Sequence, residues 1–234
     1  GNLSVRIQMH FNDGTSGQDS STQSTSFGYG TRGETMPSLS KSRVNIGENV
    51  TITMDPYSSS FSHKLYYSLN NKDLIHIDDF SKGKATKTWT LPTSLAESIT
   101  TNTEDTIYIV CKTYNGTTQV GGDKSVKLTA VVPSDYFPSI SSVTISELTA
   151  GLADKFGCFV QHKSALKIKV NCSGIAGSSI SSCTVMVDGN DYSGTTVSTG
   201  IIDSSGEMKV NVVIRDSRGR SASTSETIQV YAYS

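Results

Sequence analysis

Two stretches, IYIVCKTYNG at 107–116 and VNVVIRDSRG at 210–219, decide the fold of this 234-residue chain. In each stretch apolar residues alternate with polar ones and a glycine follows. A polar loop and a second alternating stretch come next, VKLTAVV at 126–132 and TIQVYAY at 227–233. Period-two alternation indicates a β-strand with one buried face, and a glycine that follows Asn or Asp closely suits the tip of a hairpin. The two similar hairpins indicate a duplicated β-module.

The chain as a whole predicts an all-β fold with two tandem Ig-like β-sandwich modules. Setting Gly116 opposite Gly219 brings both arms of the two hairpins into the same apolar phase. A proline opens each module, so we expect the modules at 37–132 and 133–234, preceded at 1–36 by the end of an upstream β-domain and a Gly/Ser/Thr-rich linker. Further strands are expected where short alternating segments stand between turn residues, at 50–54, 63–69, 74–78, 87–91, 165–170 and 183–189.

Three local features add to this prediction. LSVRIQMHF at 3–11 alternates cleanly and predicts a half-buried strand of the upstream domain. TSLAESI at 93–99 follows a proline and combines a capping Thr with helix formers, which predicts one or two helical turns. Trp89 alternates with two threonines, and we expect it in the core of the first module rather than on a sugar-stacking surface.

Composition argues against several classes of partner. The net charge is −1 and the pI is near 6.5, so no global positive field would hold nucleic acid or an anionic membrane. No apolar run approaches the roughly 20 residues of a membrane span, and the N-terminus lacks the pattern of a secretory signal. The four cysteines form no CxxC pair, Cys111 takes the inward phase of its strand, and a Cys172–Cys183 disulfide stays a less favoured alternative.

No pattern points to catalysis, to a cofactor or to a metal. The neighbouring Asp78 and Asp79 would point to opposite faces of a strand, unlike a pair of glycosidase carboxylates. DGNDYSG at 188–194 resembles a calcium loop but lacks its later bidentate Glu. The histidines lie in or beside strand-like segments, outside any nucleophile elbow or HExxH pair: His10, His63, His76 and His162. We therefore expect no catalytic, cofactor-binding or metal-binding residue and no enzyme activity.

Surface residues are the remaining candidates. RDSRGRSAS at 215–223 is expected to form a hairpin turn, whose arginines pack the turn or contact a neighbouring module or subunit. Receptor binding through these arginines is the less favoured alternative. Exposed tyrosines are common in interfaces, and subunit contacts are expected of some of them. The candidate interaction residues are Arg215, Arg218, Arg220, Tyr231 and Tyr233.

An ordered series of short blocks carries a family resemblance. In the first module the blocks are VNIGENVTITMDPYSSSFSHKLYYSL, TWTLPTSLAESI, TYNGTTQVGG and LTAVVP. In the second they are VTISE, FVQHKSALKIKV, AGSSISS and RDSRGRSAS. The succession resembles a family of siphophage structural proteins of Gram-positive hosts, large tail-tip or tail-fibre proteins that end in Ig-like repeats. FVQHKSALKI and DSRGR are its most distinctive blocks, and the resemblance spans most of residues 37–234.

The resemblance implies a virion tail protein that is made in the bacterial cytoplasm and used near host attachment. Its expected partners are other phage tail proteins and further copies of itself, in a homo-oligomer, with host cell-wall glycan as a candidate. It supplies no catalytic residue. Two alternatives stay open, stalk modules of a Gram-positive surface adhesin and accessory glycan-binding modules of a larger cell-wall-active enzyme.

Overall fold

The computed structural model describes residues 2–6, 24–28, 33–70 and 72–233. The chain divides into two compact units, and each unit is made of three separate segments of the sequence. The first unit consists of Gly1–Ser42, Asn49–Trp89 and Thr106–Leu128. The second consists of Arg43–Glu48, Thr90–Asp105 and Thr129–Ser234. The two modules expected at 37–132 and 133–234 are each a continuous stretch of the chain, unlike these units. Their boundaries stay a prediction.

The N-terminal segment pairs with a strand further along the chain. β1 (Asn2–Arg6) and β2 (Ser24–Gly28) form an antiparallel two-stranded sheet, with Asn2 opposite Gly28 and Arg6 opposite Ser24. The start of the strand predicted at 3–11 is therefore confirmed. The rest of that prediction, His10 included, lies outside the described residues.

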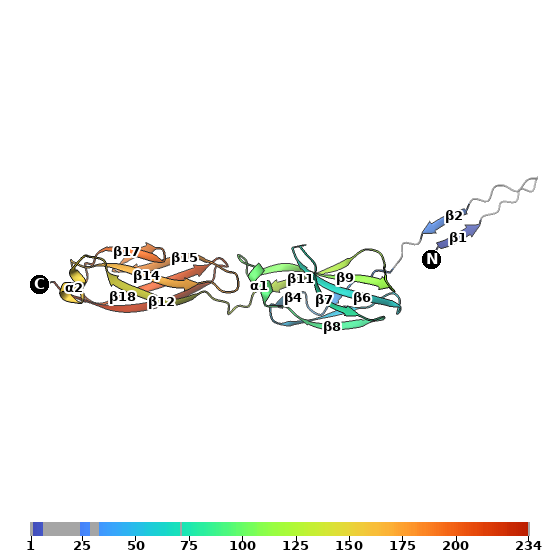
Figure 1. Ribbon diagram of the computed structural model, residues 1–234, viewed down its shortest axis with the longest axis horizontal. Coiled ribbons are helices and arrows are strands. Elements are labelled where there is room, and N and C mark those ends of the chain that lie inside the picture. Colours follow the sequence, from blue (N-terminus) through green and yellow to red (C-terminus); the bar gives the residue numbers. More distant parts are fainter. Residues whose placement is uncertain (1, 7–23, 29–32, 71, 234) are drawn as a thin grey trace, which may run out of the picture. The chain divides into compact units, whose positions relative to one another are not determined.

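Between residues 38 and 131 the strands form two sheets. The smaller sheet has the order β3 (Ser38–Leu39), β5 (Asn49–Met54) and β8 (Ala85–Thr90). The larger sheet has the order β4 (Arg43–Asn45), β11 (Lys124–Val131), β9 (Glu104–Asn115), β6 (Phe61–Leu69) and β7 (Ile75–Phe80), and β10 (Thr118–Gln119) pairs with β9. Figure 1 shows the long strands of these sheets running side by side.

Alternate residues of these strands form a core, as the period-two pattern requires. On β5 the side chains of Val50, Ile52 and Met54 are buried. On β6 and β9 the buried set is Leu65, Tyr67, Ile107, Ile109 and Cys111. Trp89 is half-buried, with its ring centroid 5.1 Å from that of Tyr67, so it lies at the margin of the core.

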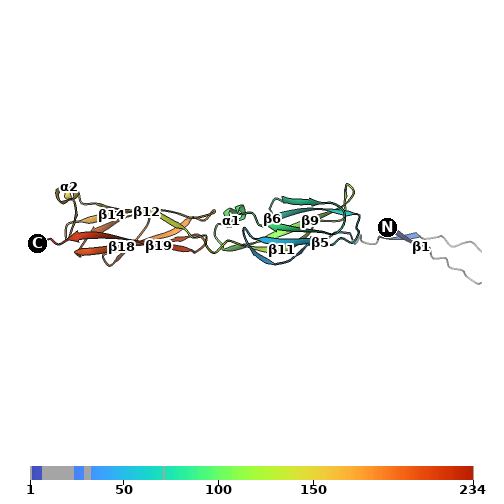
Figure 2. The ribbon, with the colours of Figure 1, turned by 90° about the horizontal axis from the view of Figure 1, so that it is seen from below.

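Residues 139–231 form a second sandwich. Its smaller sheet has the order β12 (Ser139–Glu147), β14 (Ala165–Ser173) and β17 (Thr196–Ile201). Its larger sheet has the order β13 (Phe159–Val160), β19 (Ser221–Tyr231), β18 (Gly206–Asp216), β15 (Ile180–Val187) and β16 (Asn190–Ser193). Figures 1 and 2 show the two sheets packed face to face. Both supply the core, with Leu166, Ile168, Val185, Val212 and Ile214 among its fully buried side chains.

Two short helices complete the described chain. α1 (Ser94–Ser98) buries Leu95 and Ala96 and confirms the helical turns predicted after Pro92, although Thr93 makes no side-chain capping hydrogen bond. α2 (Leu152–Phe156) lies between β12 and β13 and was not expected from the sequence. The all-β prediction is confirmed, and no described helix is long and apolar enough to cross a membrane.

Candidate interaction surfaces

The turn between β18 and β19 is built around a buried carboxylate. Asp216 is 1% exposed, and its Oδ1 accepts hydrogen bonds from the backbone N–H groups of Arg218 (3.0 Å) and Arg220 (2.8 Å). The Gly219 N–H donates to the Asp216 carbonyl at 3.0 Å, and Gly219 has a φ of +81°. Asp followed by Gly suits such a turn because an Asp side chain can replace backbone acceptors and Gly adopts a positive φ freely. The predicted hairpin turn is confirmed.

Arg218 turns its guanidinium into the protein. Its side chain, in a residue only 7% exposed, donates to the carbonyl oxygens of Ile99 (2.9 Å) and Ala96 (2.7 Å), at the C-terminal end of α1. It also donates to Ile175 O (2.8 Å) and to Ala176 O. All five residues belong to the second unit. A helix C-terminus leaves carbonyl groups without partners and favours a cation, so this guanidinium satisfies the end of α1.

Burial has an electrostatic consequence for Arg218. Desolvation lowers the pKa of its guanidinium, and the neighbouring Asp216 carboxylate opposes that change. An arginine nevertheless keeps its proton in proteins, so the site holds a permanent cation bound by backbone dipoles.

The other two arginines of the turn have different surroundings. Arg220 donates to the carbonyl oxygens of Pro133 (2.6 Å), Tyr136 (2.8 Å) and Val132 (2.9 Å). Arg215 is exposed, and its guanidinium donates to Gly219 O at 3.1 Å, within its own turn. The structure therefore brings together Arg218 and Arg220 as structural donors and leaves Arg215 on the surface.

The two candidate tyrosines lie at the end of β19. Tyr231 is 55% exposed and Tyr233 is 54% exposed. The Lys163 ammonium group lies 4.4 Å from the centroid of the Tyr233 ring, which is a close cation–π contact. Both rings are accessible to a partner, and their role in an interface stays a prediction.

A second cluster of aromatic and cationic side chains lies on the outer face of the larger sheet of the first unit, on β11, β9 and β6. Lys64 of β6 is directly opposite Lys112 of β9, and Ser62 is opposite Tyr114. Because opposite residues share a face, the strand register places these side chains on one surface. We call the tyrosine–lysine face the set Lys64, Tyr66, Tyr108, Lys112, Tyr114 and Lys127.

Each lysine of this face lies over a tyrosine ring. The distances from Nζ to the ring centroid are 5.7 Å for Lys64 and Tyr114, 5.5 Å for Lys112 and Tyr66, and 6.0 Å for Lys127 and Tyr108. These values are near the outer limit of about 6 Å for a cation–π contact, so the ammonium groups are weakly held. Strand alternation places Lys64 and Tyr66, two positions apart, on one face of β6, and places Lys112 and Tyr114 on one face of β9. Only the strand register shows which lysine lies over which tyrosine ring.

A small cavity opens at one end of the tyrosine–lysine face. It has a volume of about 350 Å³, and Ser62, Lys64, Asp79, Tyr114 and Thr117 are among the residues that line it. Lys64 Nζ lies 3.8 Å from Asp79 Oδ2, and both side chains are about half exposed. The cavity thus combines an aromatic ring, a cation, a carboxylate and hydroxyl groups.

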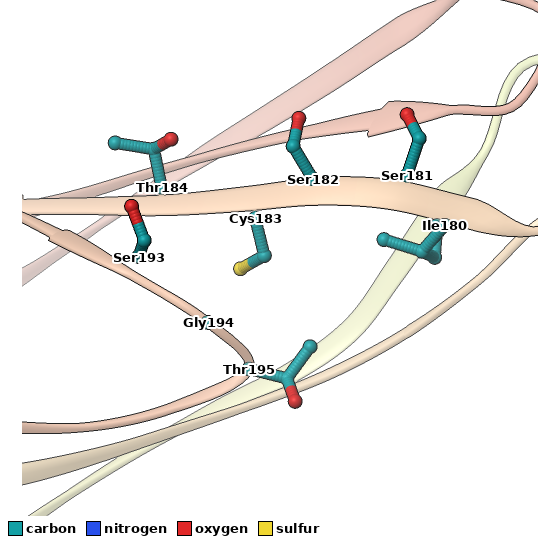
Figure 3. A pocket seen from close by; sticks show the side chains of 8 residues that line it. All are labelled: Ile180, Ser181, Ser182, Cys183, Thr184, Ser193, Gly194 and Thr195. Carbon is teal, nitrogen blue, oxygen red and sulfur yellow. The ribbon is translucent and has the colours of Figure 1, made fainter.

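Another cavity, of about 430 Å³, lies in the second unit beside β15. Figure 3 shows Ser181, Ser182 and Thr184 on one side of the strand, and Ile180 and Cys183 on the other. Its lining residues carry no charged side chain. Burial raises the pKa of the Cys183 thiol, which disfavours the nucleophilic thiolate. This cavity therefore has no group suited to acid–base or nucleophilic chemistry.

The titratable residues considered for catalysis occupy separate places. His63 is buried and bonds to Thr35 Oγ1 at 2.9 Å. Asp78 pairs with Lys87 at 2.6 Å, whereas Asp79 lies 2.7 Å from His76 Nε2. The hydrogen bond from Lys87 lowers the pKa of the Asp78 carboxyl. The two carboxylates are thus engaged by different partners, and they do not face a common substrate.

The remaining sequence candidates are structural in the described chain. DGNDYSG at 188–194 forms the β15–β16 hairpin, in which Asp188 Oδ2 accepts the Asp203 N–H at 2.9 Å. All four cysteines are free, and burial raises the pKa of Cys111 to about 11. Within the described residues no group of three or more His, Cys, Asp or Glu side chains could hold a metal ion.

Strand order and surface together define a protein of tandem β-sandwich modules whose exposed faces carry tyrosine and basic side chains. A family described as "Siphovirus protein of unknown function (DUF859)" matches residues 1–234. The chain belongs to this siphovirus family, which confirms the resemblance drawn from the sequence at the level of a siphophage protein. A comparison with curated proteins gave no match.

Solved structures of several modular proteins are similar to the chain at low identity. Fibronectin(III)-like modules of Clostridium thermocellum CbhA are 14% identical, with a TM-score of 0.31, over 84% of this chain and 94% of theirs. A tetra-tandem repeat of a large adhesion protein is 12% identical, with a TM-score of 0.44, over 91% and 53%. The mouse nectin-like molecule 4 ectodomain is 12% identical, with a TM-score of 0.32, over 85% and 64%. The fold assignment therefore rests on the strand order of the chain itself.

Proposed function

We propose that this chain is a non-enzymatic structural and adhesion component of a siphophage tail. Its β-sandwich modules would act as spacers and interaction surfaces at the tail tip and contribute to host attachment. The observation that carries the proposal is the match of a siphovirus family to residues 1–234 of a chain built from sandwich modules. The proposed site of action is the virion tail.

The physical basis of such a role is multivalency. A tail fibre or tip presents several copies of its modules, so contacts that are weak one by one become strong together. Exposed aromatic side chains are common in contacts of this kind, and basic side chains attract an anionic partner. The tyrosine–lysine face of the first unit and the pair Tyr231 and Tyr233 of the second are the surfaces that fit this role. The proposed partners are further copies of the chain, other tail proteins and host cell-wall glycan.

Labelling of intact virions tests the proposed location. Antibodies raised against the chain and coupled to gold should decorate the tail tip in electron micrographs, and their Fab fragments should slow adsorption of the phage to host cells. Label on the capsid, or normal adsorption at saturating Fab, would contradict the proposal. Fab fragments against the major capsid protein are the matched control.

The non-enzymatic part of the proposal needs a separate assay. Incubation of the purified chain with isolated host cell walls should release no reducing sugar above that of a heat-denatured sample. Release of sugar in proportion to protein concentration would show that the chain is a wall-degrading enzyme.

A further inference from the structure

The cavity at the end of the tyrosine–lysine face has the composition of a sugar-binding site. We propose that it binds one sugar of an anionic polysaccharide, and that the lysines of the face bind the phosphate or carboxylate groups of the same polymer. Its volume of about 350 Å³ is at the small end of the range of about 300–1,000 Å³ for ligand pockets, which suits a single sugar unit of a chain that continues outside. The inference deepens the proposed function and rests on it only for the source of the polymer.

Tyr114 supplies the apolar surface that a sugar ring needs. The ring is half-buried, so it is held in place while part of it faces the cavity. Aromatic side chains offer large, rigid contact area at a low cost in conformational entropy. The C–H groups on one side of a pyranose ring would lie on the Tyr114 ring, where Lys64 Nζ now lies 5.7 Å from the centroid.

Asp79 and Lys64 supply opposite hydrogen-bonding characters at the edge of the cavity. A carboxylate accepts hydrogen bonds and an ammonium group donates them, so neighbouring hydroxyl groups of one sugar can bond to both. Their separation of 3.8 Å is long for an ion pair, and their side chains are 55% and 46% exposed. Such a pair contributes little to stability, so a ligand can replace it at low cost. Ser62 and Thr117 add hydroxyl groups to the lining.

The charge of the face favours an anionic polymer over a neutral one. The face carries three lysines, against which Asp79 pairs with Lys64 and Asp123 pairs with Lys112 at 3.4 Å. Three positive and two negative side chains leave a local charge of +1, whereas the whole chain carries −1. Lys127 makes no ion pair within the described chain. Repeated anionic groups along the polymer would meet Lys112 and Lys127 in turn.

The same charge argues against a second copy of the chain as the occupant. In a two-fold symmetric interface each residue meets its equivalent region on the partner, so the lysines of one copy would approach those of the other. Like charges that approach closely in an interface cost several kcal/mol. The tyrosine–lysine face therefore fits a polyanion better than it fits itself.

Binding of the full chain to defined polymers tests the proposal. The probes are a glycosylated poly(glycerol phosphate) polymer, hyaluronic acid and neutral dextran, measured by isothermal titration calorimetry at two salt concentrations. We expect binding of at least one anionic polymer, weaker at high salt because screening reduces the contribution of the lysines. A preference for the phosphate or the carboxylate polymer identifies the anionic group. Equal binding of dextran, or no binding of either anionic polymer, would overturn the proposal.

Variants assign the binding to this cavity. Tyr114→Ala and Lys64→Gln should each weaken binding about tenfold, whereas Tyr114→Phe keeps the ring and should bind nearly as the wild type does. Circular dichroism checks that each variant is folded. Two exposed positions outside the face are matched controls, Tyr57→Ala in the first unit and Lys209→Gln in the second, and neither should change binding.

The variants also separate this proposal from its competitors. Polymer binding that survives both cavity substitutions, or is lost in Tyr57→Ala, overturns the assignment. Self-association that is lost in Tyr114→Ala without any polymer binding would identify a second copy as the occupant and also overturn it. The virion-labelling result is independent of these measurements, so a failure here leaves the tail-tip proposal intact.

Discussion

Two basic clusters of this chain use their charges in opposite ways. In the second unit Arg218 and Arg220 donate hydrogen bonds from their guanidinium groups to backbone carbonyl oxygens. Arg215 is the arginine of this turn whose side chain stays exposed. In the first unit the lysines of the tyrosine–lysine face lie at the surface above aromatic rings, and two of them also contact exposed carboxylates. A guanidinium is planar and weakly hydrated, so it can be desolvated by a set of carbonyls, whereas an ammonium group is strongly hydrated. The comparison assigns a structural role to Arg218 and Arg220 and leaves the lysines available for the recognition that we propose.

The largest effect is expected from Arg218→Ala. Removing the guanidinium leaves the carbonyl group of the buried Ile99 without its side-chain donor and breaks the bond to the half-buried Ala176, so we expect a loss of about 2–4 kcal/mol in the free energy of unfolding. Denaturation in urea followed by circular dichroism measures it. Arg215→Ala removes one exposed bond within the turn and should cost less than about 0.5 kcal/mol. Equal costs for the two variants would remove the distinction between buried and exposed arginines.

A smaller effect is expected at the glycines of the two corresponding hairpins. Gly219 has a φ of +81° and Gly116 a φ of +62°, and a Cβ at either position would meet nothing within 4 Å. Only backbone strain remains, so Gly219→Ala and Gly116→Ala should each cost about 1 kcal/mol. A much larger cost at Gly219, measured by the same urea denaturation, would show that the arginine contacts depend on the backbone of the turn.

His63 is a basic residue that is buried without the carbonyl acceptors that surround Arg218, and it loses its charge as a result. It is 1% exposed, its Nε2 bonds to Thr35 Oγ1, and its Nδ1 is buried with no hydrogen-bond partner in the described chain. Desolvation lowers the pKa of His63 below its usual value of 6.5, so the folded state holds it neutral. Below pH 6.5 the unfolded chain binds a proton that the folded chain does not, and stability falls until the pH reaches the folded pKa.

The prediction for His63 is therefore a decrease in stability as the pH falls from 7 to 5. Thermal unfolding across this range measures it, and His63→Gln should flatten that part of the curve because glutamine does not titrate. The exposed His162, with its ring Nδ1 3.3 Å from Asp203, is the control position. A curve that stays steep in His63→Gln but flattens in His162→Gln would place the titration elsewhere.

Much of the fold could be predicted because the relevant signals are local. Strand alternation identified β5, β6, β9, β14, β18 and β19, and Asp216 with Gly219 three positions later identified the turn. The strands that the sequence missed include β12, β16 and β17, and in the last two Ser, Thr, Gly and Asn replace most of the apolar residues. DGNDYSG, compared above with a calcium loop, contains β16 itself, because a tight hairpin and an ion site both use Asp, Asn and Gly.

The candidate surfaces were less predictable because they depend on distant residues. The carbonyl acceptors of Arg218 lie 42 to 122 positions away in the chain, so the pattern RDSRGR could not show that this arginine is buried. In the same way Lys64 and Tyr114 meet only through the pairing of β6 with β9. Alternation assigns a residue to a face, and only the strand register assigns it a neighbour.

The smallest change in stability is expected from Lys127→Gln, which bears most directly on the comparison. Lys127 is exposed, lies 6.0 Å from the Tyr108 centroid and makes no ion pair within the described chain, so its loss should change the free energy of unfolding by less than about 0.5 kcal/mol. The same substitution should weaken binding of the anionic polymer and reduce its salt dependence, because it removes one charge from the surface that meets the polymer. Calorimetric titration beside urea denaturation measures both quantities. A large loss of stability with unchanged binding would place this lysine with Arg218 among the structural cations.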